Sequence, residues 1–251
     1  MAQDFYDKVA KKFGNYTTPA KSIDEFPYGE PEKIFKEKLL ALSGEDKVVL
    51  DAGCGDGRFT LSIARYFKKA IGNDTSGLML KAALKLRGEK EISNVEFIER
   101  PTNELDYPEN YFDVIYSRRS PTNYPLFYKM LKPGGYVLYI GIGETDAEGI
   151  KKIFGRGQNY GQWNNPALKR EAEKIEQGGF KIVYAQDFYY NEYYLSYSDL
   201  DIFLQGVPIF EDYDSLKDKK HLEEYAKKFQ KEKGIDLPRH RIVLVAKKIR
   251  I

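Results

Sequence analysis

Two acids and a run of glycines mark the part of the sequence best suited to binding a ligand. DAGCGDG at residues 51–57 follows the apolar run KVVL and places Asp51 directly before alternating glycines. Small residues in such a turn let a ligand contact the backbone, and a helix that begins there presents free N–H groups. The spacing differs from the G-x-G-x-x-G of dinucleotide sites, and Asp51 would repel a pyrophosphate but attract an ammonium or sulfonium group. The pattern therefore argues against NAD.

A second acid, Asp74, ends the next apolar run in IGND. In doubly wound sheets, an acid at the end of the second strand accepts hydrogen bonds from ribose hydroxyls. Because the carboxyl ends of neighbouring parallel strands meet at one edge, we expect Asp51 and Asp74 to lie near each other at a ligand-binding switch point.

The elements that must position these acids alternate between apolar strands and helical stretches. Continuous apolar strands separated by helices are typical of a parallel α/β sheet with both faces covered. We expect strands at 47–53, 69–74, 95–99, 112–117 and 135–143, with helices at 59–67, 77–88 and 126–135.

The flanking segments differ in pattern. Residues 1–45 are predicted to be helical, and after residue 145 the alternation weakens to helices, an amide-rich loop, the aromatic run 180–197 and a final strand at 240–248. We therefore divide the chain into an N-terminal helical lid (1–45), a core (46–145) and a C-terminal part (146–251) that completes the sheet and selects the substrate.

Four motifs in order carry a family resemblance over residues 5–145. VVLDAGCGDGRFT resembles the first motif of class I S-adenosylmethionine-dependent methyltransferases, and IGNDTSGLMLKAA resembles their second. ENYFDVIYS and YKMLKPGGYVLYIG resemble their fourth strand, helix and fifth strand, most closely in the small-molecule branch that includes ubiquinone/menaquinone methyltransferases. The resemblance implies a doubly wound, mostly parallel seven-stranded α/β sheet with an antiparallel strand near the C-terminus and a C-terminal cap.

The resemblance also implies S-adenosylmethionine as the cofactor, S-adenosylhomocysteine as the product and no metal. Asp51 is expected to face the methionyl amino group and Asp74 the ribose hydroxyls. The family usually has an acid after the third strand for the adenine amino group, whereas Pro101 stands there. Its substitutes are Thr102 and Asn103, or alternatively Glu99. The implied cofactor contacts are Tyr16 (as part of the lid), Asp51, Gly53, Cys54, Gly55, Asp74, Thr75, Met79, Thr102, Asn103 and Ser117.

The motifs exclude one nucleic-acid subclass of the family and argue against a second. Pyrimidine C5 methylation needs a catalytic thiolate, and the one cysteine, Cys54, lies inside the glycine turn. The (N/D)PP(Y/F) motif of amino-group nucleic-acid methyltransferases is replaced by SRRSPTN at 117–123. Arg118 and Arg119 in this segment either bind an anionic group of the substrate or pack on local carbonyls.

No catalytic residue follows from the sequence, because alignment of the acceptor can supply much of the rate of an in-line displacement. His240 is a weak candidate. Glu144 and Asp146 lie at the carboxyl edge, where a base would be useful, but capping of the following helix is the favoured interpretation. The chain is rich in aromatic residues, with 20 Tyr and 15 Phe. We consider stacking on a substrate or packing in an edge strand for Tyr160, Trp163, Tyr189, Tyr190, Tyr193 and Tyr194.

Composition limits the partners. The 251 residues carry a net charge of +2, which disfavours nucleic acid but does not exclude it. The absence of a long apolar run and of a signal segment, together with a single cysteine, predicts a cytoplasmic protein without a membrane partner. The sequence leaves the oligomeric state open. We expect methyl transfer to a small or medium-sized acceptor; the alternatives are RNA methylation and a non-catalytic S-adenosylmethionine-binding sensor or partner subunit.

Overall fold

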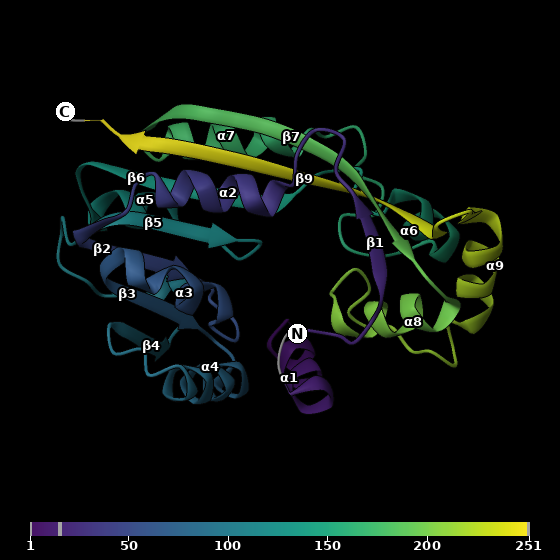
Figure 1. The fold of residues 1–251 in the computed structure, drawn as a ribbon. Helices are drawn as coiled ribbons and strands as arrows, with labels where there is room; N and C mark the ends of the chain where they lie inside the picture. Colours follow the sequence, from purple (N-terminus) through teal and green to yellow (C-terminus); the bar gives the residue numbers. More distant parts are fainter. Residues whose placement is uncertain (1, 15–16, 250–251) are drawn as a thin grey trace. The chain divides into compact units, whose positions relative to one another are not determined.

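A computed structural model describes residues 2–14 and 17–249, which fall into two compact units (Figure 1). The sheet unit comprises Pro31–Gly141, Ala167–Gln186 and Ile242–Ile251, and the helical unit comprises Met1–Glu30, Ile142–Pro166 and Asp187–Arg241. The three-part division at residues 45 and 145 stays a prediction, because it concerns function rather than compactness.

The elements of the sheet unit alternate between strands and helices. They are α2 (Pro31–Leu40), β2 (Gly44–Ala52), α3 (Arg58–Ile63), β3 (Phe67–Asp74), α4 (Gly77–Glu89), β4 (Val95–Glu99), β5 (Phe112–Arg118), α5 (Tyr124–Met130), β6 (Leu131–Ile142) and α7 (Ala167–Gln177), with single 3₁₀ turns at Ala64–Tyr66 and Thr102–Glu104. Two long strands, β7 (Phe180–Tyr194) and β9 (Gly234–Lys248), have residues in both units.

The order of the strands places the predicted site at a switch point. In the described part of the sheet unit the order is β7-β9-β6-β5-β2-β3-β4. β2 is paired in parallel with both β3 and β5, and β3–β4 and β5–β6 are also parallel. The arrows of β7 and β9 point in opposite directions (Figure 1). The doubly wound, mostly parallel sheet is thus confirmed. From β2 the chain winds to β3 and β4 on one side, and β5 and β6 lie on the other side, so the direction of winding reverses at β2, where such sheets bind ligands.

Apolar residues on neighbouring strands form the core of the sheet unit. Leu50 lies opposite both Ile71 and Ile115, and the three side chains are fully buried. Phe127 and Met130 of α5 belong to the same buried cluster. Strands buried on both faces read as continuous apolar runs, which is why the sequence predicted them well.

The helical unit has its own core. It contains α1 (Ala2–Phe13), β1 (Ser22–Glu25), α6 (Glu148–Phe154), α8 (Tyr197–Gly206), α9 (Lys219–Phe229) and β8 (Gln230–Lys231). Phe154 and Phe210 stack with ring centroids 4.4 Å apart, among buried leucines of α8 and α9. β1 pairs with β7 and β8 with β9, both antiparallel, so two short strands add to the seven predicted ones.

Three elements depart from the sequence prediction. β6 begins at Leu131, so residues 131–135, predicted as the end of the helix 126–135, are strand. Residues 22–25 form β1 although 1–45 was predicted to be helical, and residues 197–206 form α8, capped by the Ser196 side chain, where no separate helix was predicted. Over residues 2–14 and 17–249, no helix combines the length and the apolar character needed to cross a membrane.

Candidate cofactor site

The glycine turn after β2 is built from left-handed backbone. Gly53, Gly55 and Gly57 have φ values of 81°, 55° and 68°, which favour glycine. A Cβ at Gly53 would overlap the Ser120 side chain, and one at Gly57 would lie 2.5 Å from the Phe97 ring. A Cβ at Gly55 would meet nothing within 4 Å. Gly53 and Gly57 therefore serve close packing, whereas Gly55 borders open space.

Asp51, the last residue but one of β2, has a buried carboxylate with only one hydrogen-bonded oxygen. Its Oδ2 accepts hydrogen bonds from Thr60 Oγ1 at 2.6 Å and from the Tyr116 hydroxyl at 2.8 Å. Its Oδ1 is buried without a partner. Burial raises the pKa of Asp51 to about 6, against the opposing effects of Thr60, Arg118 and Tyr116. A buried carboxylate oxygen without a hydrogen-bond partner is suited to a ligand with a positively charged donor group.

Asp74, at the end of β3, ties the glycine turn to α4. Its Oδ2 accepts the Gly55 N–H at 2.8 Å, and its Oδ1 accepts the Ser76 N–H at 3.0 Å. The N–H groups of Gly53 and Cys54 both donate to the carbonyl of Asn73, at 3.0 and 2.8 Å. The structure thus brings together the predicted residues of the first two motifs.

Asn73 was missed by the sequence analysis. Its side chain is buried, and Nδ2 donates to the Arg100 carbonyl at 3.0 Å and to Thr102 Oγ1 at 3.2 Å, while Oδ1 has no partner. Thr102, predicted as a substitute for the absent acid, is therefore linked to the end of β3. A polar residue inside an apolar strand, next to Asp74, was the available signal.

Glu99 and Asn103, the other candidates for the adenine contact, are both exposed. The Glu99 carboxylate lies against Gly77 at the start of α4, where a Cβ would be 2.8 Å from Oε2. This position beside the Asp74–Ser76 contact favours Glu99 over Asn103 as the candidate for the adenine contact.

The remaining predicted residues lie at the margins of the site. Thr75 is exposed, and Met79 is buried with its N–H donating to Ser76 Oγ at 3.2 Å. Ser117 donates to the carbonyl of Ser120 at 3.0 Å, in the loop that touches Gly53. Tyr16 lies outside the described residues.

Arg118 and Arg119 share one carboxylate, Glu32 at the start of α2. Arg118 Nη2 donates to Glu32 Oε2 at 2.8 Å, and Arg119 Nη1 pairs with Oε1. Although burial raises the pKa of Glu32, the charges of Arg119 and Arg118 outweigh it and lower the pKa to about 2. The predicted alternative of packing on local carbonyls is replaced by an ion pair with a residue 86 positions away.

The aromatic segment in β7 alternates in its exposure. Tyr190 and Tyr194 are buried, whereas Tyr189 is 48% exposed and stacks on the His240 ring at 4.1 Å. Tyr160 and Trp163 contact each other edge to face in the loop before α7. The alternation favours the packed-strand interpretation for Tyr190 and Tyr194.

The predicted helix cap at Asp146 is wrong. Its Oδ1 accepts from Arg239 Nε at 2.9 Å, from the His240 N–H at 3.0 Å and from Arg241 Nη1 at 2.5 Å, and α6 has no side-chain cap. These arginines lower the pKa of Asp146 well below its usual range, despite its burial. Asp146 therefore organises a buried charge network, a role that short-range sequence patterns do not indicate.

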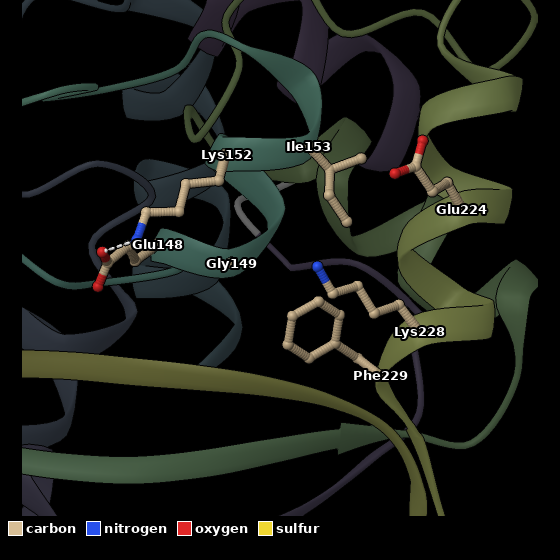
Figure 2. Close-up of a pocket in the computed structure, with 7 residues that line it drawn as sticks. All are labelled: Glu148, Gly149, Lys152, Ile153, Glu224, Lys228 and Phe229. Carbon is tan, nitrogen blue, oxygen red and sulfur yellow. Dashed lines mark ion pairs between the residues drawn. The ribbon is translucent and has the colours of Figure 1, made fainter.

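A pocket of about 520 Å³ lies in the helical unit, between α6 and α9 (Figure 2). Its lining comprises Glu148, Gly149, Lys152, Ile153, Glu224, Lys228 and Phe229, with Glu148 and Lys152 paired at 2.5 Å. None of the predicted cofactor residues lines it. Among the described residues, no group of three or more His, Cys, Asp or Glu is arranged to hold a metal ion.

Comparisons with known proteins agree with this geometry. Residues 49–135, from β2 to the start of β6, match the family described as methyltransferase domain. The chain is 33% identical over 199 residues to phosphoethanolamine N-methyltransferase 1 of Arabidopsis thaliana, covering 65% of this chain and 40% of the relative. Residues 49–135 carry a methyltransferase domain.

Further similarities extend beyond the domain. The ubiquinone/menaquinone biosynthesis C-methyltransferase UbiE of Vibrio cholerae is 26% identical over 160 residues, covering 59% of this chain and 62% of the relative. A Haemonchus contortus phosphoethanolamine N-methyltransferase 2, solved with phosphomonomethylethanolamine and S-adenosylhomocysteine, has a TM-score of 0.56 at 17% identity, covering 99% of this chain and 58% of that one. The chain spans less than two thirds of the length of these relatives.

Proposed function

We propose that this chain transfers a methyl group from S-adenosylmethionine to a small-molecule acceptor. The observation that carries the proposal is the buried Asp51 carboxylate, with its unpaired Oδ1, beside a glycine turn that borders open space at Gly55. A carboxylate in this setting is suited to an α-ammonium group, and the neighbouring Asp74 is suited to two ribose hydroxyls. The residues present therefore fit this cofactor.

The proposed cofactor contacts are those of the sequence analysis, with the glycine turn at their centre. Asp51 binds the ammonium group, and the backbone from Gly53 to Gly55 lies along the ligand. Asp74 gives up part of its hydrogen bonding to Gly55 and Ser76 and accepts hydrogen bonds from the ribose hydroxyls instead. Further proposed contacts are Cys54, Thr75, Met79, Thr102 and Ser117, together with Tyr16 and with Glu99 in place of Asn103.

Methyl transfer demands orientation more than proton chemistry. S-adenosylmethionine supplies a methyl group on a positively charged sulfur, and the acceptor's electron pair displaces that sulfur as a neutral thioether. The chain's contribution is to fix the donor end at Asp51 and Asp74 and to hold the acceptor in line. Such alignment can be worth effective molarities on the order of 10⁵ M or more. No described side chain is assigned as a general base.

A small acceptor is supported by the relatives, which are named for phosphoethanolamine and for ubiquinone/menaquinone biosynthesis. The alternatives of RNA methylation and of a non-catalytic sensor are not favoured by these similarities, and the net charge of +2 gives RNA little electrostatic attraction. The cytoplasmic location stays a prediction, which the single free cysteine supports.

Calorimetric titration with S-adenosylmethionine tests the cofactor assignment. We expect binding in the micromolar range, weakened at least about tenfold by Asp74→Ala, which removes a charged acceptor of two hydrogen bonds. Asp212→Ala is the matched control, since Asp212 lies in the helical unit with a side chain 73% exposed. Equal affinity in Asp74→Ala and in the control would place the cofactor elsewhere.

A further inference from the structure

Arg118 lies at the end of β5, next to the strand that carries Asp51. Its guanidinium stacks 4.0 Å from the Phe59 ring centroid, and Nη2 donates to Glu32. Its Nε–H is buried and has no hydrogen-bond partner. A buried charged donor is costly to leave unpaired, so it calls for an acceptor that the chain itself does not provide.

Buried polar atoms without a hydrogen-bond partner lie near the carboxyl ends of three neighbouring strands. Over the described ranges, three buried side-chain atoms lack a partner: Asp51 Oδ1, Asn73 Oδ1 and Arg118 Nε. They lie on β2, β3 and β5, which are adjacent and parallel. Asp51 supplies a negatively charged acceptor and Arg118 a positively charged donor. Together they complement the ammonium and carboxylate groups of an amino acid.

The same aromatic residues position both charged groups. The Tyr116 hydroxyl donates to Asp51, and the Tyr116 ring meets Phe59 edge to face at a centroid distance of 5.6 Å. Phe59 in turn lies beneath the Arg118 guanidinium. Arg118 is close enough for its charge to act on the Asp51 carboxylate. The two groups thus belong to one rigid cluster within the sheet unit.

We propose that Arg118 binds the α-carboxylate of the methionyl part of S-adenosylmethionine through its unpaired Nε–H, while Asp51 binds the α-ammonium group. This inference rests on the proposed function and adds a residue that discriminates ligands by their carboxylate. Glu32 holds the guanidinium by its Nη2 edge and leaves Nε for the ligand. Glu32 faces both Arg118 and Arg119, so these three side chains together keep a net positive charge that a carboxylate neutralises.

A purely structural role for Arg118, holding α2 to β5 through Glu32, makes a different prediction. Loss of such a tie would weaken every ligand of the site alike. Binding of the carboxylate weakens only ligands that possess one. Decarboxylated S-adenosylmethionine, which keeps the ammonium and sulfonium groups, separates the two roles.

Calorimetric titration of the full chain with both compounds tests the inference without an acceptor. We expect wild type to prefer S-adenosylmethionine by about 10- to 100-fold, the range of a charged hydrogen bond. Arg118→Met should lower this preference to about onefold, with unchanged affinity for the decarboxylated compound. Arg119→Gln, which alters the other arginine paired with Glu32, should keep the wild-type preference.

The outcomes separate the inference from the function on which it rests. A wild-type preference retained in Arg118→Met overturns the role of Arg118, while binding of both compounds still supports the cofactor site. Failure of S-adenosylmethionine itself to bind wild type overturns the proposed function. If Arg118→Met does not fold by circular dichroism, Arg118→Lys replaces it; its single ammonium pairs with Glu32, so most of the preference should still be lost, and a preference retained in full overturns the inference.

Discussion

The pKa of Asp51 makes cofactor affinity depend on pH in a way that can be calculated. With a pKa of about 6 in the free protein, Asp51 is about 91% ionised at pH 7 and about 9% ionised at pH 5. An α-ammonium group stays protonated over this range, since its ordinary pKa is about 7.7–8.0. The protonated acid can no longer accept the ammonium group as an anion. We therefore expect the dissociation constant for S-adenosylmethionine to rise about tenfold from pH 7 to pH 5.

The assay is titration calorimetry at pH 5, 6 and 7 at constant ionic strength. Asp51→Asn should bind more weakly at pH 7, by at least about tenfold, and its affinity should vary little over the range. Asp74→Asn should keep a pH dependence, shifted to lower pH because the charge of Asp74 raises the pKa of Asp51, which separates Asp51 from the neighbouring carboxylate. The charged groups that face Asp51 include Arg118, which lowers its pKa, and Asp74, which raises it. A flat wild-type profile, or the same slope in Asp51→Asn, would refute the reasoning.

Further predictions concern stability, measured by urea unfolding unless stated. Gly53→Ala should lower the free energy of unfolding by about 2–3 kcal/mol, because its Cβ would overlap a neighbouring side chain in left-handed backbone. Gly55→Ala should lower it by about 1 kcal/mol, because its Cβ would meet no neighbouring atom. Equal losses of stability would contradict this packing difference. Because its pKa is lowered to about 2, ionised Glu32 contributes about 1–3 kcal/mol of stability, which is full above pH 4.5 and lost as the pH falls towards 2. Glu32→Gln should therefore make the melting temperature depend less on pH over that range. A pH dependence equal to that of wild type would contradict this contribution. Asp146→Asn should cost about 3–5 kcal/mol and Asp212→Asn less than about 0.5; comparable values would exclude a buried network.

Much of the sheet unit could be predicted because its strands are buried on both faces. Continuous apolar runs located β2 to β5 closely, and the glycine turn with Asp74 marked the switch point. β1 was missed because SIDE is polar and exposed, so its pairing with β7 depends on backbone bonds that leave no apolar pattern. α8 was missed because it directly follows the aromatic strand.

The partners of the charged residues could not be predicted, because they are distant in the sequence. Asp51 is bound by Tyr116, 65 positions away, and Asp146 by Arg239, 93 positions away. Such pairs depend on which strands become neighbours, and a local pattern contains no information on this. The acid in ETDAEG therefore resembled a helix cap, although the fold surrounds it with arginines.

Methyl transfer itself is tested most directly with methyl-labelled S-adenosylmethionine. The purified chain is incubated with an extract of cells that naturally produce it, and the label is followed into low-molecular-weight, RNA and protein fractions, with Asp74→Ala as the control. The proposed function predicts label in a small molecule, dependent on wild-type protein. Label that appears only in RNA or protein, or no label above the Asp74→Ala control, would contradict it.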